Sequence, residues 1–161
     1  MANYRRPRVP GATIFFTVAL ADRASDLLVR EVDALRGAVA RTQAERPFGI
    51  DAWVVLPDHM HCVLRMPDGD ADYPTRWRII KARFARSVAM GPRRPSHVAR
   101  RERGVWQRRY WERHVRCEAE RAACIRYCWT NPVKHDLCAT PEDWPHSSIH
   151  AAIRAGTYAL P

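Results

Sequence analysis

The strongest constraint on the fold is a long apolar run that is broken once by a Pro-Asp pair. Residues 48–56 read FGIDAWVVL, and residues 59–66 read HMHCVLRM. Aromatic and β-branched residues favour strands on both sides of the break, and a Pro-Asp pair is typical of a tight turn. The pattern therefore predicts a β-hairpin, with His59 and His61 on its second strand.

Strand and helix patterns alternate around this hairpin. The predicted strands are 12–20, 48–56, 59–66 and 105–116, and the predicted helices are 25–46, 74–90 and 118–131. Their order is strand, helix, strand, strand, helix, strand, helix. It predicts an α+β fold, with one antiparallel sheet and helices packed on one face, of the ferredoxin or RRM-like kind.

The length of 161 residues predicts a single domain, 1–161. A basic N-terminal arm (1–11) precedes the first strand, and a Pro- and Arg-rich stretch (91–104) predicts a flexible loop. The helix over 118–131 is expected to end at Pro132, since the residue before a proline is pushed out of helical geometry. Residues 136–161 form a mixed tail with a short helix near 147–156.

Composition excludes several classes of protein. Apolar residues make up 47% of the chain, which is typical of a globular protein, and no apolar run reaches the ~18 residues that a membrane span needs. No signal-peptide core follows the basic N-terminus, so we expect a cytoplasmic protein. The cysteines are odd in number and lack CxxC spacing, which favours reduced thiols over a metal site or disulfides: Cys62, Cys117, Cys124, Cys128 and Cys138.

The charge of the chain indicates a polyanionic partner. Lys and Arg number 27 against 17 acids, a net charge of +10, and only two of the 27 are lysines. Genomic GC bias also raises arginine content, so the placement of the arginines is the better evidence. Residues 93–116 carry nine arginines against Glu102 and Glu112, interleaved with tryptophan and tyrosine. Basic groups beside aromatic rings suit a nucleic-acid surface, above all a single-stranded one.

His59 and His61 are expected to project from the same face of their strand, while Met60, Cys62 and Leu64 point to the other. Such a pair has two interpretations. It forms either two half-exposed polar residues on an open sheet face, or two ligands of a divalent cation. Two imidazoles side by side repel one another when protonated, and a bound cation removes that repulsion, so metal binding is favoured.

Tyr127 and Asn131 are four residues apart and share one face of the predicted helix. If that face packs across the histidine pair, the Asn131 oxygen completes a ligand set and the Tyr127 hydroxyl stands beside the metal. Without that packing, Tyr127 is a core aromatic and Asn131 a helix cap. Tyr110 is the rival nucleophile because arginines surround it, but its strand position favours stacking or core packing.

Several spaced motifs resemble those of one known family. AWVVLPDHMHCVLRMP, WQRRYWERHVR, YCWTNPVKHDL and DWPHSS occur in the same order as in the REP-associated tyrosine transposases, which are single-tyrosine HUH nucleases. The resemblance covers essentially the whole chain and implies that His59 and His61 form the HUH motif. It further implies Tyr127 as nucleophile and Asn131 as third metal ligand. Where the family often has paired glycines before its first strand, this chain has Gly11 alone.

The resemblance implies an enzyme that cuts single-stranded DNA beside a hairpin of a repeated extragenic palindrome (REP). Tyr127 would attack the scissile phosphorus, leaving a 5′-phosphotyrosine and a free 3′-hydroxyl that can later reverse the step. Mg²⁺ or Mn²⁺ is the implied cofactor. Because neutral histidines are needed for ligation, activity is expected to fall below a pH of roughly 6.5.

The expected DNA contacts lie in the arm, on the second helix and near the fourth strand, and they predict an affinity that falls steeply with salt. They are Arg5, Arg6, Gly11, Arg76, Arg78, Lys81, Arg108, Arg109, Arg113 and Lys134. Two alternatives stay open: a hairpin-binding protein that does not cleave, and a zinc-dependent hydrolase of phosphoesters. A nucleoid-associated monomer is expected, although a dimer is not excluded.

Overall fold

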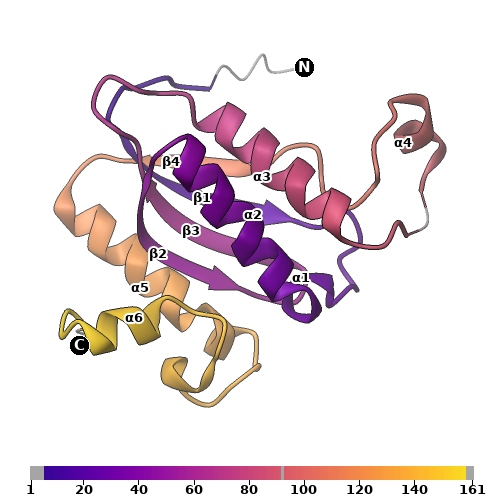
Figure 1. The fold of residues 1–161 in the computed structure, drawn as a ribbon. Helices are drawn as coiled ribbons and strands as arrows, with labels where there is room; N and C mark the ends of the chain where they lie inside the picture. Colours follow the sequence, from indigo (N-terminus) through magenta and orange to yellow (C-terminus); the bar gives the residue numbers. More distant parts are fainter. Residues whose placement is uncertain (1–5, 92, 159–161) are drawn as a thin grey trace.

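The computed structural model describes residues 6–91 and 93–158, and a four-stranded antiparallel sheet lies at its centre (Figure 1). The strands lie in the order β2-β3-β1-β4. Their bounds are β1 (Thr13–Ala19), β2 (Gly49–Val55), β3 (His59–Arg65) and β4 (Trp111–Val115). The predicted α+β class is confirmed, and β2 and β3 form the predicted hairpin. The histidine-bearing strand β3 is thus an inner strand, flanked on both sides.

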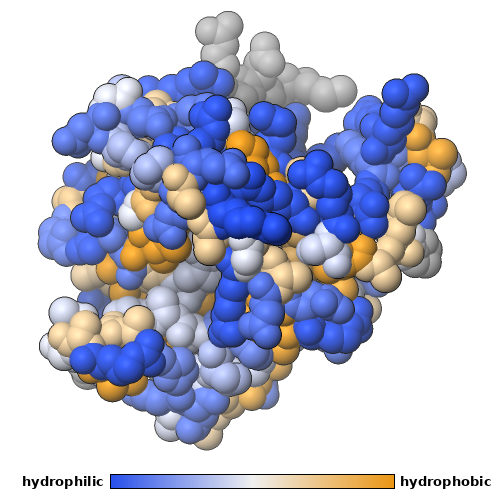
Figure 2. All heavy atoms as spheres, in the orientation of Figure 1, coloured by the Kyte–Doolittle hydropathy of each residue, from blue (hydrophilic) through white to orange (hydrophobic). Residues whose placement is uncertain are grey.

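Three helices cover one face of the sheet: α1 (Leu27–Arg30), α2 (Val32–Glu45) and α3 (Tyr73–Ser87). The core on this side includes Phe16, Met60, Trp77 and Phe84, all fully buried or nearly so. The single helix expected over 25–46 is interrupted at Glu31, between α1 and α2. Figure 2, in the same orientation, shows that hydrophilic residues cover most of the exposed surface on this side.

The opposite face is covered by α5 (Glu118–Lys134) and by the C-terminal segment with η1 (Pro141–Asp143) and α6 (Ile149–Arg154). The expectation that helices lie on one face is therefore wrong in this respect. The physical reason is that the inner strands are apolar on both sides. Phe15 and Phe16 point to opposite faces, and both are buried.

Helix α5 continues through Pro132 to Lys134, beyond the predicted end. A proline inside a helix lacks one N–H and so removes one hydrogen bond, but the backbone N–H of His135 donates to the carbonyls of Asn131 and Pro132 and closes the last turn. The additional residues carry the helix past the histidine pair. His135 becomes the C-cap of α5.

The predicted loop over 91–104 contains a short helix, α4 (Pro95–Ala99), which projects from the body of the molecule (Figure 1). His97 is buried, and its Nδ1 accepts from the backbone N–H of Arg94 at 3.3 Å. The Arg103 guanidinium donates to the Val88 carbonyl at 3.1 Å. Polar side chains thus bond to the backbone of this segment and fold it locally.

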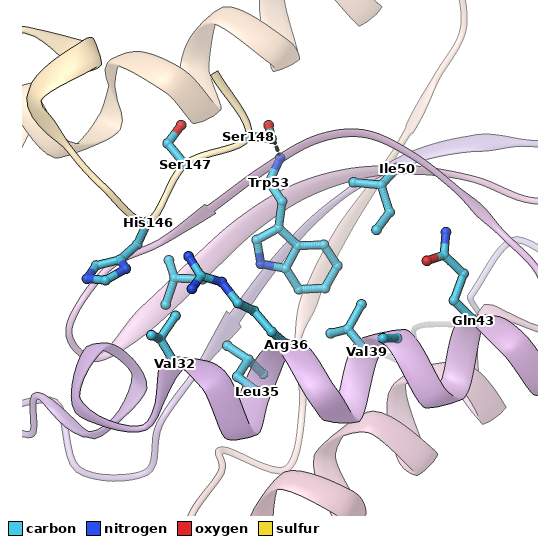
Figure 3. Close-up of a pocket in the computed structure, with 12 residues that line it drawn as sticks. Val32, Leu35, Arg36, Val39, Gln43, Ile50, Trp53, His146, Ser147 and Ser148 are labelled. Atoms are coloured by element: carbon cyan, nitrogen blue, oxygen red, sulfur yellow. Dashed lines mark hydrogen bonds between the residues drawn. The ribbon is translucent and has the colours of Figure 1, made fainter. Parts of the chain in front are cut away.

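The DWPHSS segment (143–148) closes the outer edge of β2. The Trp144 indole donates to the Val55 carbonyl at 2.8 Å, and Val55 N–H donates to the His146 carbonyl at 2.9 Å. Trp53 N–H donates to Ser148 Oγ at 2.8 Å, beside a cavity of about 300 Å³ between α2 and β2 (Figure 3). Covering an edge strand in this way blocks pairing with another chain.

No helix among the described residues has the length and apolar character that crossing a membrane would require.

Candidate active site

His59 and His61 lie at the start of β3, on the face that α5 covers, and each is 5% exposed. Their ring centroids are 4.9 Å apart. Met60, Cys62 and Leu64 belong to the core on the opposite face. The side chains therefore alternate as the strand pattern predicts, but the histidines are buried under a helix and do not lie on an open sheet face.

Hydrogen bonds orient both imidazole rings through their Nδ1 atoms. His61 Nδ1 lies 2.8 Å from Thr17 Oγ1, and His59 Nδ1 lies 2.7 Å from Asp58 Oδ1. Arg23 forms an ion pair with the other Asp58 oxygen at 2.5 Å. When Nδ1 is held by such a partner, Nε2 is the ring atom left for a ligand, which is the arrangement usual for metal-binding histidines.

Burial keeps both histidines neutral. It lowers the pKa of His59, although the bond to Asp58 opposes this effect. It also lowers the pKa of His61 to about 3, helped by the positive charge that His59 and His135 carry when protonated. Neutral imidazoles have a free lone pair at neutral pH, so these rings can bind a cation without first losing a proton.

One stripe of α5 lies over the histidine pair. Tyr127, Asn131 and His135 are spaced by four residues and share a helix face. The Tyr127 ring meets His61 edge-on at 5.2 Å between centroids, and His135 meets His59 at 5.2 Å. Asn131 lies between them along the helix and is 1% exposed. The structure thus brings together the four residues that the sequence singled out as the site.

The Asn131 side chain is the most unusual member of this cluster. Its Oδ1 atom is buried and has no hydrogen-bond partner among the described residues. An unpaired buried carbonyl oxygen destabilises a protein by about 1–3 kcal/mol, so such atoms in native proteins call for an explanation. A cation held with the two imidazoles would satisfy it. The donor set of two nitrogens and one amide oxygen therefore fits a divalent metal ion.

Tyr127 is 40% exposed, so its hydroxyl group can be reached from solvent. Its ring packs edge-on against Phe15 at 5.7 Å, and Lys134 Nζ lies 4.6 Å from the ring centroid. These contacts hold the ring beside His61. A positive charge near the phenol also attracts the negative charge that develops on a reacting phosphate.

Tyr110 lies on the other face of the sheet. Its ring contacts Phe16 and Trp77 in the core under α3, and the Arg6 guanidinium lies 3.9 Å from its centroid. Burial raises the pKa of Tyr110 well above its usual range. The whole sheet separates this hydroxyl from the histidine pair, so the structure places Tyr110 in the core, as the sequence favoured.

Comparison with known proteins decides the family. The chain is 38% identical over 160 residues to the REP-associated tyrosine transposase of Escherichia coli (strain K12), covering 99% of this chain and 90% of that protein. It is 36% identical over 160 residues to a putative REP-associated tyrosine transposase of Haemophilus influenzae (strain ATCC 51907 / DSM 11121 / KW20 / Rd), covering 98% of this chain and 91% of that protein. The chain belongs to the REP-associated tyrosine transposases.

A solved structure of a REP-associated tyrosine transposase bound to a REP hairpin is similar along the whole chain. The TM-score is 0.85 at 39% identity, with 99% of this chain and 89% of the other covered. No protein-family model matches the chain. Membership makes this protein an enzyme of the tyrosine transposase class with the fold of that family.

In this transposase, four of the predicted DNA contacts surround a second groove, of about 660 Å³, between α3 and the segment before β4. The four are Arg6, Arg78, Lys81 and Arg108. Lys81 also donates to the carbonyls of Gln107 and Arg108, at 2.6 and 3.3 Å, and burial lowers its pKa to about 8. This groove lies on the α3 side of the sheet, away from the histidines.

The prediction that Arg76 contacts DNA is wrong. Arg76 is 2% exposed, and its guanidinium donates to Asp70 at 2.7 Å and to the backbone carbonyls of Arg46, Asp72 and Pro47. Two of these bonds join α3 to the loop after α2, and the other two hold the segment that leads into α3. Arg78, two residues further along the helix, is exposed and lines the basic groove.

The remaining predicted contacts are spread over the molecule. Arg113 faces the active-site side and pairs with Glu120, Lys134 covers Tyr127, and Arg109 is exposed. Gly11 has a positive φ of 67° in a turn, and its N–H donates to the Asp70 carbonyl. The backbone conformation alone therefore accounts for a glycine at this position, and no DNA contact is needed to explain it. Arg5 lies outside the described residues.

Sequence reasoning missed the groups that orient the imidazoles. Thr17 and Arg23 come from distant parts of the chain and carry no local signal. Asp58 was taken only as a turn residue, although a carboxylate directly before His59 is a signal that could have found it.

Proposed function

We propose that this transposase cuts and rejoins single-stranded DNA beside a REP-type hairpin, with Tyr127 as its nucleophile. The observation that carries the proposal is the Tyr127 ring against His61, at 5.2 Å, on the buried-histidine face of the sheet. The name of the E. coli relative and the hairpin bound by the solved relative support the choice of substrate.

In the proposed cutting step, the Tyr127 hydroxyl loses its proton as its oxygen forms a bond to the scissile phosphorus. The bond from phosphorus to the 3′ oxygen breaks, and that oxygen takes up a proton. The 5′ end of the downstream fragment is then held on the protein as a phosphotyrosine ester. Because one phosphoester replaces another, a 3′-hydroxyl can attack the phosphotyrosine in reverse and rejoin a strand without an external energy source.

His59, His61 and Asn131 would hold a divalent ion, Mg²⁺ or Mn²⁺, through two Nε2 atoms and the Asn131 oxygen. When bound, such an ion neutralises charge on the reacting phosphate. Asp58 and Thr17 keep the two rings in position through their Nδ1 atoms. The zinc hydrolase alternative is not favoured, since no group of three or more His, Cys, Asp or Glu side chains in ranges 6–91 and 93–158 is placed to hold a metal.

The basic groove on the α3 side is proposed to hold the phosphates of the hairpin. Arg6, Arg78 and Arg108 lie around it, and its seven basic side chains outnumber its one acid, Glu102, which pairs with Arg108 at 3.0 Å. Several such contacts make affinity fall steeply with salt, because each one releases counterions from DNA. All four residues of the proposed site come from one chain, which favours a monomer. Acting on chromosomal repeats would place the protein in the cytoplasm, on the nucleoid.

The test is formation of a covalent protein–DNA adduct. The protein is incubated with Mn²⁺ and a single-stranded oligonucleotide that carries a REP hairpin and its unpaired flanks from the source genome. We expect a band that resists SDS and disappears with EDTA or with Tyr127→Phe, while hairpin binding by Tyr127→Phe persists.

Tyr110→Phe is the matched control and should retain the adduct. Loss of the adduct in Tyr110→Phe, with Tyr127→Phe still active, would reverse the assignment. Hairpin binding without an adduct in several metals would identify a non-cleaving hairpin-binding protein. An adduct that requires tightly bound zinc would contradict the choice of metal.

A further inference from the structure

A groove of about 470 Å³ lies beside Tyr127, between the outer strand β4 and helix α5. Its lining includes Phe15, Trp111, Arg113, Glu120 and Tyr127. The groove is on the same face of the sheet as the histidine pair and is distinct from the basic groove on the α3 side. It therefore borders the place where the proposed cutting step would occur.

The strand register places Trp111 in line with the site. Trp111 pairs with Thr17, and Thr17 pairs with His61 on its other side. Directly paired residues share a face of the sheet. Trp111 therefore stands in the same row as His61, two strands away, a separation of about 10 Å at the usual strand spacing. A DNA strand that passes Tyr127 could therefore also reach Trp111.

Trp111 is the one exposed tryptophan of the six, and all six lie within the described residues. Its side chain is 56% exposed, although burial of an indole stabilises a protein strongly. The ring meets Phe15 edge-on, at 5.8 Å and 72°. Phe15 also contacts the Tyr127 ring, so one buried residue holds both the exposed indole and the proposed nucleophile.

The polar side of the groove suits the edge of a base better than a phosphate. Arg113 pairs with Glu120 at 3.2 Å, and Glu120 also accepts from the backbone N–H of Arg116 at 3.0 Å. With one guanidinium against one carboxylate, this groove has no net positive charge to attract a phosphate, unlike the basic groove. An adjacent guanidinium and carboxylate instead offer donors and acceptors side by side, which are the groups that proteins use to read base edges.

We propose that this groove is a subsite for one unpaired nucleobase, which stacks on Trp111 and presents its edge to Arg113 and Glu120. The inference rests on the proposed DNA-cutting function. Since Trp111 and Tyr127 contact the same Phe15 ring, the base belongs to a nucleotide close to the phosphate that Tyr127 attacks. The subsite would select where along the flank of a hairpin the strand is cut.

The experiment uses the REP-hairpin oligonucleotide with 2-aminopurine placed at one unpaired flank position at a time. EDTA is present so that the strand stays uncut. Stacking on an indole quenches 2-aminopurine fluorescence, so quenching reports the stacked position. The proteins compared are the wild type, Trp111→Ala and Trp111→Phe. Ile50→Ala is the matched control, because Ile50 is also a partly exposed apolar residue but lies on the other outer strand.

We expect the wild type and Ile50→Ala to quench one flank position. Trp111→Ala should lose that quenching and bind about fivefold to a hundredfold more weakly, the range found for stacked bases. Trp111→Phe keeps an aromatic ring and should retain part of both effects. Circular dichroism of each variant checks that the fold is intact.

Hairpin binding by the wild type without quenching at any position would overturn the subsite and leave the proposed function standing. Unchanged affinity and quenching in Trp111→Ala would overturn it as well. Absence of hairpin binding by the wild type would instead contradict the proposed function, and the subsite with it.

Discussion

Arg76 and Asn131 are both almost completely buried polar side chains, but they differ in their hydrogen-bond partners. Under α3, Arg76 is surrounded by acceptors and makes four hydrogen bonds. Under α5, the Asn131 oxygen has no hydrogen-bond partner among the described residues. A buried polar group that is fully paired serves the fold. One that stays unpaired beside two neutral imidazoles is better explained by a ligand.

Removal of Arg76 should give the largest loss of stability. Arg76→Ala leaves Asp70 and three carbonyls without their donor, and loss of hydrogen bonds from a buried charged group should lower the free energy of unfolding by about 3 kcal/mol. Arg78 lies two residues further along α3 and is exposed, so Arg78→Ala should change the free energy of unfolding by less than about 0.5 kcal/mol. Urea unfolding measures both variants.

The variants Arg76→Ala and Arg78→Ala also distinguish a role in stability from a role in DNA binding. Arg78→Ala should weaken hairpin binding and lower the slope of log affinity against log salt by about 1. An equal loss of stability in the two variants would contradict the structural role given to Arg76.

Replacement of Asn131 should have the opposite effect on stability. Asn131→Leu removes an unpaired buried oxygen and should raise the free energy of unfolding of the metal-free protein by about 1–2 kcal/mol. The same change should abolish adduct formation, because a proposed ligand is lost.

Thr42→Val provides the matched control for this comparison. The buried Thr42 hydroxyl donates to the Ala38 carbonyl at 2.7 Å, so its loss should lower stability by about 1 kcal/mol. Stability that falls in Asn131→Leu as it does in Thr42→Val would show that the Asn131 oxygen has a partner in solution.

The histidine pair predicts a smaller, pH-dependent effect. His59 and His61 have a lower pKa in the folded protein than the value of 6.5 in the unfolded chain, and that of His61 is about 3. The unfolded state therefore binds more protons below pH 6.5. The stability that these groups contribute is fully present above pH 6.5 and is lost as pH falls toward the folded pKa, by up to about 1.4 kcal/mol per pH unit for each histidine.

Urea unfolding of the metal-free protein between pH 7 and 5 measures this slope, and His61→Asn should flatten it. A wild-type stability that does not change over this range would contradict neutral, buried imidazoles. The lowered pKa values also revise the acid limit of activity, which should lie below the pH of roughly 6.5 that the sequence suggested.

The local parts of this account could be predicted from the sequence. Alternation along residues 59–66 placed both histidines on one face, and helical spacing placed Tyr127 and Asn131 together. What failed depended on contacts between distant segments. Two of the four acceptors of Arg76 are the carbonyls of Arg46 and Pro47, some 30 residues away. The nearby Asp70 did not by itself distinguish Arg76 from an exposed arginine in a surface ion pair.

One further prediction failed, and one feature could not be predicted. A proline normally predicts the end of a helix, but α5 continues through Pro132 because its last turn is capped by His135, which then lies against His59. Trp106 and Trp111 lie in the same short segment, but Trp106 is buried and Trp111 is exposed. Nothing in the local sequence indicates which of the two is exposed. In each case, packing against another element decides the outcome.

The most direct test of the central claim, that the chemistry belongs to the α5 face, is to map the DNA-bearing residue in the wild-type protein. After adduct formation, nuclease trimming and trypsin digestion, Tyr127 lies in the peptide YCWTNPVK and Tyr110 in the peptide YWER. We predict that mass spectrometry finds the added phosphonucleotide on the peptide with Tyr127. Its presence on the peptide with Tyr110, on the opposite face of the sheet, would contradict the account.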